Sequence, residues 1–152
     1  LIAVLAALLN YFIIMSLFIG VLLISGARPG FEMLAALPVI AIITGFAVGL
    51  GLLGATINVY YRDVEQFTAV LTQFWFWLTP IIYPAAIVPA QYRSFIEWNP
   101  IYPLVVAMQD IFLRATLPQW ISLAYPLAVA AISLILGALV YFKLGQDMTD
   151  EL

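Results

Sequence analysis

Cysteine and histidine are both absent from the 152 residues of this sequence. Their absence excludes disulfide bonds, thiolate nucleophiles and imidazole bases from the chain, together with the usual ligands of zinc and haem. Lysine occurs once, at Lys143, and no G-x-x-x-x-G-K-[ST] pattern is present. The chain therefore carries no P-loop for ATP, and we expect no cofactor, no metal site and no catalytic site within it.

Charge is also scarce, because only 9% of the residues are charged while 66% are hydrophobic and the mean hydropathy is +1.13. Soluble domains have about 45–50% apolar and about 25% charged residues. The composition therefore predicts an integral membrane protein, and the long apolar runs predict an all-α fold. A net charge of −3 argues against nucleic acid as a partner. No carboxylate falls at the centre of an apolar run long enough to span a membrane, so we do not expect an enzyme.

Four apolar runs reach the length of about 20 residues that crosses roughly 30 Å of hydrocarbon. The predicted spans are 1–25, 33–57, 67–88 and 121–142. We interpret 1–152 as one transmembrane domain. Because it begins with Leu1 inside an apolar run, we expect that an N-terminal part of the natural protein precedes it. The few basic residues do not orient the spans by charge.

Residues 89–120 do not fit a simple loop. The apolar stretch LVVAMQDIFL lies between Pro103 and Pro118, and its ten residues are too few to span. We expect short re-entrant or interfacial helices that pack over, or dip into, a protein-lined cavity, because irregular backbone at membrane depth needs partners. The alternative is a folded loop on the lipid surface.

Small residues gather in the second span. Gly45 and Gly49 are four residues apart, a spacing that lets two helix backbones approach closely. We predict packing within the helix bundle, with a dimer seam as the alternative. The same stretch matches G-x-G-x-x-G, which carries no weight in the middle of a spanning run.

The stretch FWFWLTPIIYP, residues 74–84, is rich in aromatic side chains. Such rings are common at the membrane interface. Because Phe74 to Trp77 cover a full helical turn, some rings must face the bundle interior, where they would hold a sugar face or an acyl chain. Both interpretations stay open at this point.

The stretch NVYYRDVEQF, residues 58–67, packs three charges into four positions. Arg62 and Glu65 are three apart, which allows a weak pair on one helical face. The simplest interpretation is a solvated turn between helices. Two tyrosines and an apolar face beside the charges equally indicate a docking surface for a soluble partner.

These stretches, followed by WNPIYPLVVAMQDIFL, resemble the permease subunit of ABC-2 type exporters over residues 45–120. The resemblance is greatest to the branch that exports O-antigen, capsule and teichoic acid polysaccharides. The matching residues are Asn58, Tyr60, Arg62, Asp63, Trp77, Thr79, Pro80, Tyr83, Asn99, Pro100 and Pro103.

The resemblance implies a six-helix permease of the cytoplasmic membrane, of which this chain holds the last four helices. It implies that 58–66 is a cytoplasmic coupling loop beside a separate ATPase subunit, which binds the ATP. It implies that 89–120 forms gate helices at the outer face. Two permease copies, as a homodimer in membrane lipid, would work with two ATPases and pass a lipid-linked glycan between them.

The resemblance also gives roles to residues. The expected coupling residues are Asn58, Tyr60, Tyr61, Arg62, Asp63 and Glu65. The expected translocation path contains Phe74, Trp75, Trp77 and Tyr83. The expected gate contains Trp98, Asn99, Pro100, Pro103 and Arg114.

Two other functions compete with polysaccharide export. One is an ABC-2 exporter of a small hydrophobic drug or lipid, and the other is a membrane scaffold that transports nothing. The tail GQDMTDEL is acidic, whereas tails in the family are usually basic, so the contact of the C-terminus is an open question.

Overall fold

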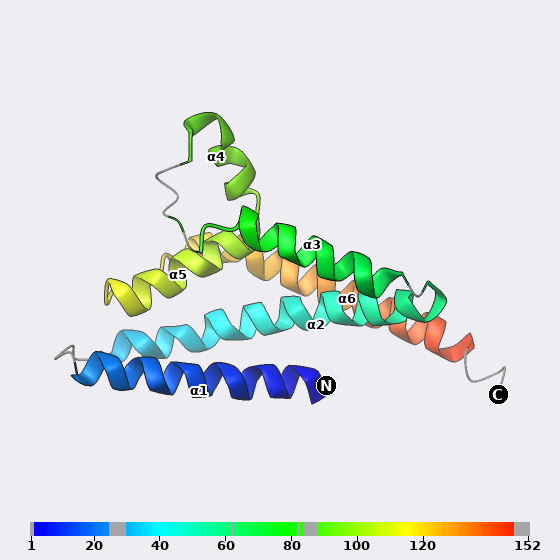
Figure 1. Ribbon diagram of the computed structural model, residues 1–152, viewed down its shortest axis with the longest axis horizontal. Helices are drawn as coiled ribbons and strands as arrows, with labels where there is room; N and C mark the ends of the chain where they lie inside the picture. Colours follow the sequence, from blue (N-terminus) through cyan, green and yellow to red (C-terminus); the bar gives the residue numbers. More distant parts are fainter. Residues whose placement is uncertain (1, 25–29, 62, 82, 84–87, 148–152) are drawn as a thin grey trace.

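The computed structural model describes residues 2–24, 30–61, 63–81, 83 and 88–147 (Figure 1), and the regular structure in these residues is entirely helical. This confirms the all-α prediction. The elements are α1 Ile2–Ile24, the 3₁₀ helix η1 Phe31–Ala35, α2 Ala36–Tyr60, α3 Val64–Leu78, α4 Ala90–Glu97, α5 Ile101–Leu113, the 3₁₀ helix η3 Trp120–Leu123 and α6 Ala124–Asp147.

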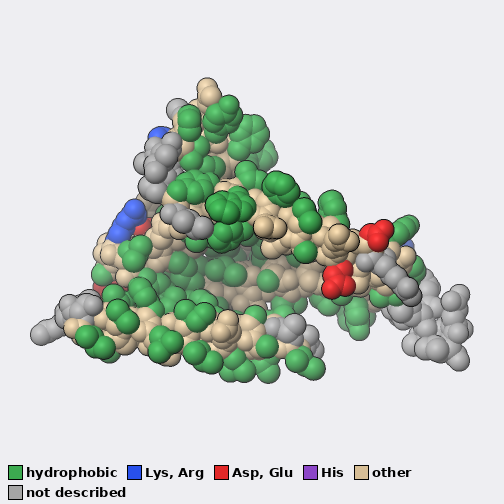
Figure 2. All heavy atoms as spheres, viewed as in Figure 1, with side chains coloured by type: hydrophobic (Ala, Val, Ile, Leu, Met, Phe, Trp, Pro, Cys, Tyr) green, Lys and Arg blue, Asp and Glu red, His purple; other side chains and the backbone are tan. Residues whose placement is uncertain are grey.

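Three stretches of helix in the described residues are long and apolar enough to cross a membrane: Val4–Ile24, Phe31–Tyr60 and Trp120–Lys143. They coincide with the predicted spans 1–25, 33–57 and 121–142. Hydrophobic side chains cover most of the face in Figure 2, and the coloured charges lie toward its edges. This distribution is what a protein surrounded by lipid requires, because a charge is costly at the bilayer centre.

The predicted third span, 67–88, is not one continuous helix. α3 has fifteen residues, which corresponds to about 22 Å. It ends at Leu78 because Thr79 precedes Pro80, and the residue before a proline is pushed from helical to extended backbone. The prediction also included 82 and 84–87, which lie outside the described residues. A fourth crossing therefore stays a prediction.

The closest helix pair is formed by α2 and α6, which lie side by side in Figure 1. Gly49 faces the backbone of α6, and a Cβ atom added there would lie 2.5 Å from the backbone nitrogen of Leu134. A Cβ atom added at Gly137 would lie 2.6 Å from the carbonyl oxygen of Gly49. At Gly45, the nearest atom is a methyl carbon of Leu134, at 3.3 Å. Both predicted packing glycines therefore face another helix of the same chain.

α5 belongs to the core of the bundle and does not form a separate surface layer. Its fully buried side chains are Leu104 and Ile111. They pack with η1, the start of α2 and η3 in one apolar cluster, whose buried members are Ala35, Ala36, Val39, Leu104, Ala107, Ile111 and Leu123. Within the predicted segment 89–120, α5 thus packs against protein, whereas α4 projects away from the long helices (Figure 1).

We predict that Gly49→Ala lowers the free energy of unfolding by about 1–3 kcal/mol, because its Cβ would enter the backbone of α6. The effect is measured by heating the protein in detergent and recording the temperature at which half of the monodisperse protein is lost, which is taken as the melting temperature. Gly51→Ala is the matched control, since a Cβ at Gly51 has nothing within 4 Å. Equal melting temperatures for the two variants would contradict the close packing of α2 on α6.

Candidate functional site

The predicted coupling loop, 58–66, is largely helical. α2 continues through Tyr60 and α3 begins at Val64, so few residues lie between the two helices. The Asn58 side-chain oxygen accepts a hydrogen bond of 3.1 Å from the backbone N–H of Glu65. The first N–H groups of a helix have no partner within it, so Asn58 of α2 satisfies one of these donors in α3. The polar side chain thereby connects the last turn of α2 to the first turn of α3.

This turn presents aromatic and acidic groups to the outside. Tyr60 and Tyr61 are 50% and 69% exposed, and Asp63 and Glu65 are exposed at the start of α3. Carboxylates are favourable there, because a helix N-terminus carries a partial positive charge. The predicted pair of Glu65 with Arg62 involves a residue outside those the structure describes.

At its other end, α3 meets the link between α4 and α5 through three side chains that we call the Asn99 cluster: Trp75, Thr79 and Asn99. The indole N–H of Trp75 donates to the Asn99 side-chain oxygen at 2.9 Å. The Asn99 side-chain N–H donates to the Thr79 hydroxyl oxygen at 2.8 Å, and that hydroxyl donates to the Trp75 carbonyl at 2.9 Å. Thr79 and Asn99 are buried, so these bonds are protected from competing solvent.

Asn99 also accepts hydrogen bonds from the first backbone N–H groups of α5. Its side-chain oxygen accepts the N–H of Ile101 at 3.1 Å, and its carbonyl accepts the N–H of Tyr102 at 3.0 Å. Pro100 and Pro103 have no N–H to satisfy. The motif N-P-x-x-P therefore begins a helix without leaving an unpaired donor in its first turn.

The four predicted path residues occupy different environments. Trp75 is half-buried, and its ring lies edge-on to that of Phe46 on α2, with centroids 5.7 Å apart. Phe74 and Trp77 are 66% and 62% exposed. The Tyr83 hydroxyl donates to the Trp77 carbonyl at 3.1 Å and so satisfies the backbone at the end of α3. Their predicted contact with a glycan stays a prediction.

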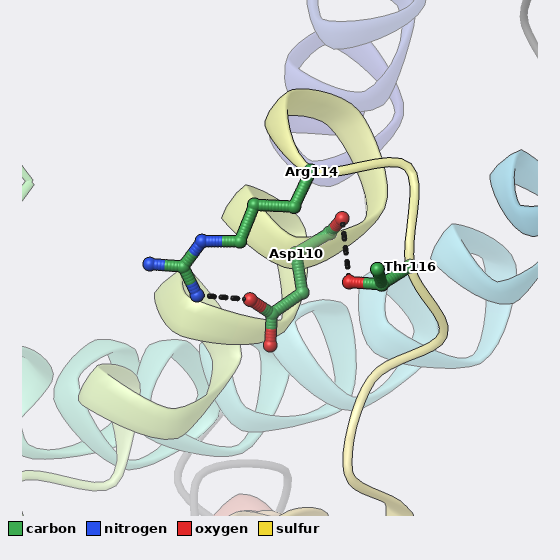
Figure 3. A network of polar contacts seen from close by, with 3 residues as sticks. All are labelled: Asp110, Arg114 and Thr116. Carbon is green, nitrogen blue, oxygen red and sulfur yellow. Dashed lines mark hydrogen bonds and ion pairs between the residues drawn. The ribbon is translucent and has the colours of Figure 1, made fainter.

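The predicted gate residues lie at both ends of α5. Near its start, the exposed Trp98 has a carbonyl that accepts the Tyr125 hydroxyl of α6 at 2.8 Å. At its end, Arg114 forms an ion pair with Asp110, and the Thr116 hydroxyl donates to the Asp110 carbonyl (Figure 3). Arg114 is separated from Asn99 by the length of α5, so the structure does not bring the five gate residues together.

Three residues of this site escaped prediction as site residues: Phe46, Thr79 and Tyr125. Thr79 belongs to the matching motif, yet the resemblance assigned it no role at the site. Phe46 is one aromatic residue within an apolar run, and Tyr125 lies 27 positions from its partner Trp98. No spacing rule connects such distant positions, so only the folded chain shows these contacts.

The arrangement is that of a helical membrane protein with a polar turn at one end of α3 and a hydrogen-bonded helix junction at the other. Residues 1–113 match the ABC-2 type transporter family. The chain belongs to that family and is a multi-pass protein of the cytoplasmic membrane.

Curated relatives have names that refer to polysaccharide transport. An O-antigen export system permease protein RfbA of Klebsiella pneumoniae is 28% identical over 146 residues, which cover 95% of this chain and 56% of the relative. A protein of the same name from Myxococcus xanthus is 35% identical over 103 residues, covering 65% and 38%. The polysialic acid transport protein KpsM of Escherichia coli is 22% identical over 93 residues, covering 61% and 36%. The chain thus spans about half the length of its relatives, or less.

We predict that Asn58→Ala weakens the first turn of α3 by about 1 kcal/mol, because the Glu65 N–H loses its partner. Amide hydrogen exchange in residues 64–68 would then be roughly fivefold faster, as that free energy implies. Asn10→Ala, at an exposed position of α1, serves as the control. Unchanged exchange at the Glu65 amide would show that Asn58 does not stabilise this turn.

Proposed function

We propose that this chain is part of the permease of an ATP-driven exporter that moves a lipid-linked polysaccharide across the cytoplasmic membrane. O-antigen, capsule and teichoic acid are the polymer classes considered. The observation that carries the proposal is similarity over 95% of the chain to a permease named for O-antigen export. The name of the polysialic acid transport relative supports the polymer class.

The α2–α3 turn is the proposed docking site of a separate ATPase, which supplies the ATP chemistry that the chain lacks. η1 and α2 together contain 30 residues, or about 45 Å of helix, and exceed a hydrocarbon thickness of roughly 30 Å. One end therefore extends beyond the lipid core. The exposed rings of Tyr60 and Tyr61, with the carboxylates of Asp63 and Glu65, supply a mixed aromatic and polar surface suited to a protein partner.

We also propose a homodimer of permeases with two ATPases, and a glycan path between the two copies. α3 supports this assembly because none of its side chains is buried in the single chain. Phe74 and Trp77 project from it with most of their surface uncovered. Aromatic faces stack on sugar rings, and a series of weak stacking contacts would let a long polymer continue to move.

One observation favours the alternative, an exporter of a small hydrophobic molecule. An apolar groove of about 350 Å³ lies between α1 and α2, lined by Val4, Ala7, Leu8, Tyr11, Ile40, Ile43, Thr44 and Ala47. The Tyr11 hydroxyl has no hydrogen-bond partner among the residues that the structure describes. Such a groove suits an acyl chain or a drug, whereas a glycan needs many polar partners.

We predict that a photo-crosslinker on Glu65→Cys, in the full-length protein in intact cells, captures an ABC ATPase identifiable by mass spectrometry. These 152 residues contain no cysteine that would compete for the label, and any cysteine elsewhere in the full-length protein is replaced. Ser94→Cys on α4 is the control and should not capture the ATPase. Capture of lipid alone, or of a protein from the outer side, would contradict the proposal and favour the scaffold function.

We predict that Trp77→Ala slows polysaccharide export several-fold without lowering the amount of permease in the membrane, because a stacking surface is lost. Export is measured as glycan at the cell surface, and abundance by immunoblotting of membranes. Trp120→Ala is the matched control, since Trp120 is also exposed but lies outside α3. Unchanged export in Trp77→Ala would place that ring against lipid instead.

A further inference from the structure

α3 is held at its two ends more firmly than along its length. None of its side chains is buried, and α2 is the helix that it contacts most. The bond from the Glu65 N–H to Asn58 fixes its first turn, and the Asn99 cluster fixes its last turn. A helix attached in this way moves as one rigid element when either end is displaced.

The pair of helices α2 and α6 forms the rigid part of the fold, relative to which α3 would move. α2 and α6 approach so closely that neither Gly49 nor Gly137 has room for a Cβ atom. Packed cores resist small deformations, so this pair keeps its geometry. Among the described residues, α3 packs much less extensively on α2 than α6 does. Outside the turn, its contact with α2 includes the edge of the Trp75 ring on Phe46.

α4 depends on the same junction for its position. Of its described side chains only Ile96 is buried, and the helix projects from the bundle (Figure 1). The link that follows α4 is held from α3 through Asn99 and from α6 through the Tyr125 hydroxyl on the Trp98 carbonyl. Asn99 is therefore one contact through which a displacement of α3 relative to α6 can reach both short helices.

We infer that the Asn99 cluster transmits movement of the α2–α3 turn to α4 and α5, so that ATPase action at one end of α3 repositions the short helices at the other. This inference rests on the proposed function and adds the residues that connect its two sites. Thr79 and Asn99 are positioning residues, because they act through α4 and α5 and need not touch the glycan. Trp75 takes part in this transmission through its indole N–H, which donates to Asn99.

Thr79 gives the sharpest test, because valine has the same shape as threonine and lacks only the hydroxyl. Thr79→Val removes the acceptor of the Asn99 side-chain N–H while preserving volume. Thr79→Ser restores the hydroxyl and should restore function. Thr72→Val is the matched control on the same helix, since the exposed Thr72 hydroxyl bonds to the Thr68 carbonyl one turn earlier and not to Asn99.

The experiment uses the full-length permease with its ATPase in lipid nanodiscs. Any cysteine outside these residues is replaced, and a trifluoroethylthio label is attached at Glu65→Cys or, in a second preparation, at Ser94→Cys. ¹⁹F NMR then records whether each resonance shifts on addition of ATP and vanadate. Export of glycan and hydrolysis of ATP are measured on the same variants.

With native Thr79 we expect both resonances to respond to nucleotide. In Thr79→Val we expect the Glu65 response and ATP hydrolysis to remain, while the Ser94 response falls at least fivefold and export falls with it. Trp75→Phe, which keeps the ring but loses the N–H, should show the same separation. Thr79→Ser and Thr72→Val should keep both responses.

Three results would overturn the inference, and they are distinguishable. A full Ser94 response in both Thr79→Val and Trp75→Phe would show that movement reaches α4 by another route, while the proposed function stands. Absence of any nucleotide response at Glu65 with native Thr79 would remove the proposed function itself, and the inference with it. A parallel loss of both responses and of ATP hydrolysis in Thr79→Val would show that the cluster maintains the fold and does not transmit movement.

Discussion

Backbone hydrogen bonding at helix ends is the constraint on which the arrangement of this chain depends. In a lipid environment each unpaired N–H or carbonyl costs several kcal/mol. α3 ends just before Pro80 and α5 begins just after Pro100, so two helix ends meet in one region. At the start of α5, the side-chain and main-chain oxygens of Asn99 accept backbone N–H groups. Because a carboxamide both donates and accepts, the same side chain also bonds to Trp75 and Thr79 at the end of α3. Asn99 thereby joins the end of α3 to the start of α5.

The helices divide into a closely packed part and a loosely held part. α2, α5 and α6 share buried apolar surface or direct backbone approach, whereas α1 and α3 contribute no fully buried side chain among the described residues. A transporter needs both kinds of element, since some helices must keep their relation while others change theirs. The chain combines them without any charged residue inside α1 or α6 before Lys143.

The sequence predicted the features that depend on long, uninterrupted runs of apolar residues. Spans 1–25, 33–57 and 121–142 were recognisable because no charged residue interrupts them. The end of α3 was misplaced because hydropathy continues past Pro80 while backbone geometry does not. The loop predicted at 58–66 was too long, because its polar residues belong in part to the end of α2 and the start of α3. The bond from the Glu65 N–H to Asn58 supports this arrangement.

Pairings between distant residues were beyond sequence reasoning for a different reason. Trp75 and Asn99 were assigned to different sites, a path and a gate, because each matched a separate motif. Their hydrogen bond joins positions 24 residues apart, and no periodicity relates them. Gly137 was also missed, since one glycine in an apolar run gives no spacing, whereas Gly45 and Gly49 gave one.

The shortness of α3 has a consequence for the surrounding lipid. Its fifteen residues cover about 22 Å, compared with about 37 Å for the 25 residues of α2. Where α3 lies against lipid, the helix is shorter than a hydrocarbon core of roughly 30 Å, and each Å of mismatch costs a fraction of a kcal/mol. Acyl-chain length therefore enters the energy of every position that α3 adopts, and the thickness of the host bilayer becomes one of the forces acting on this helix.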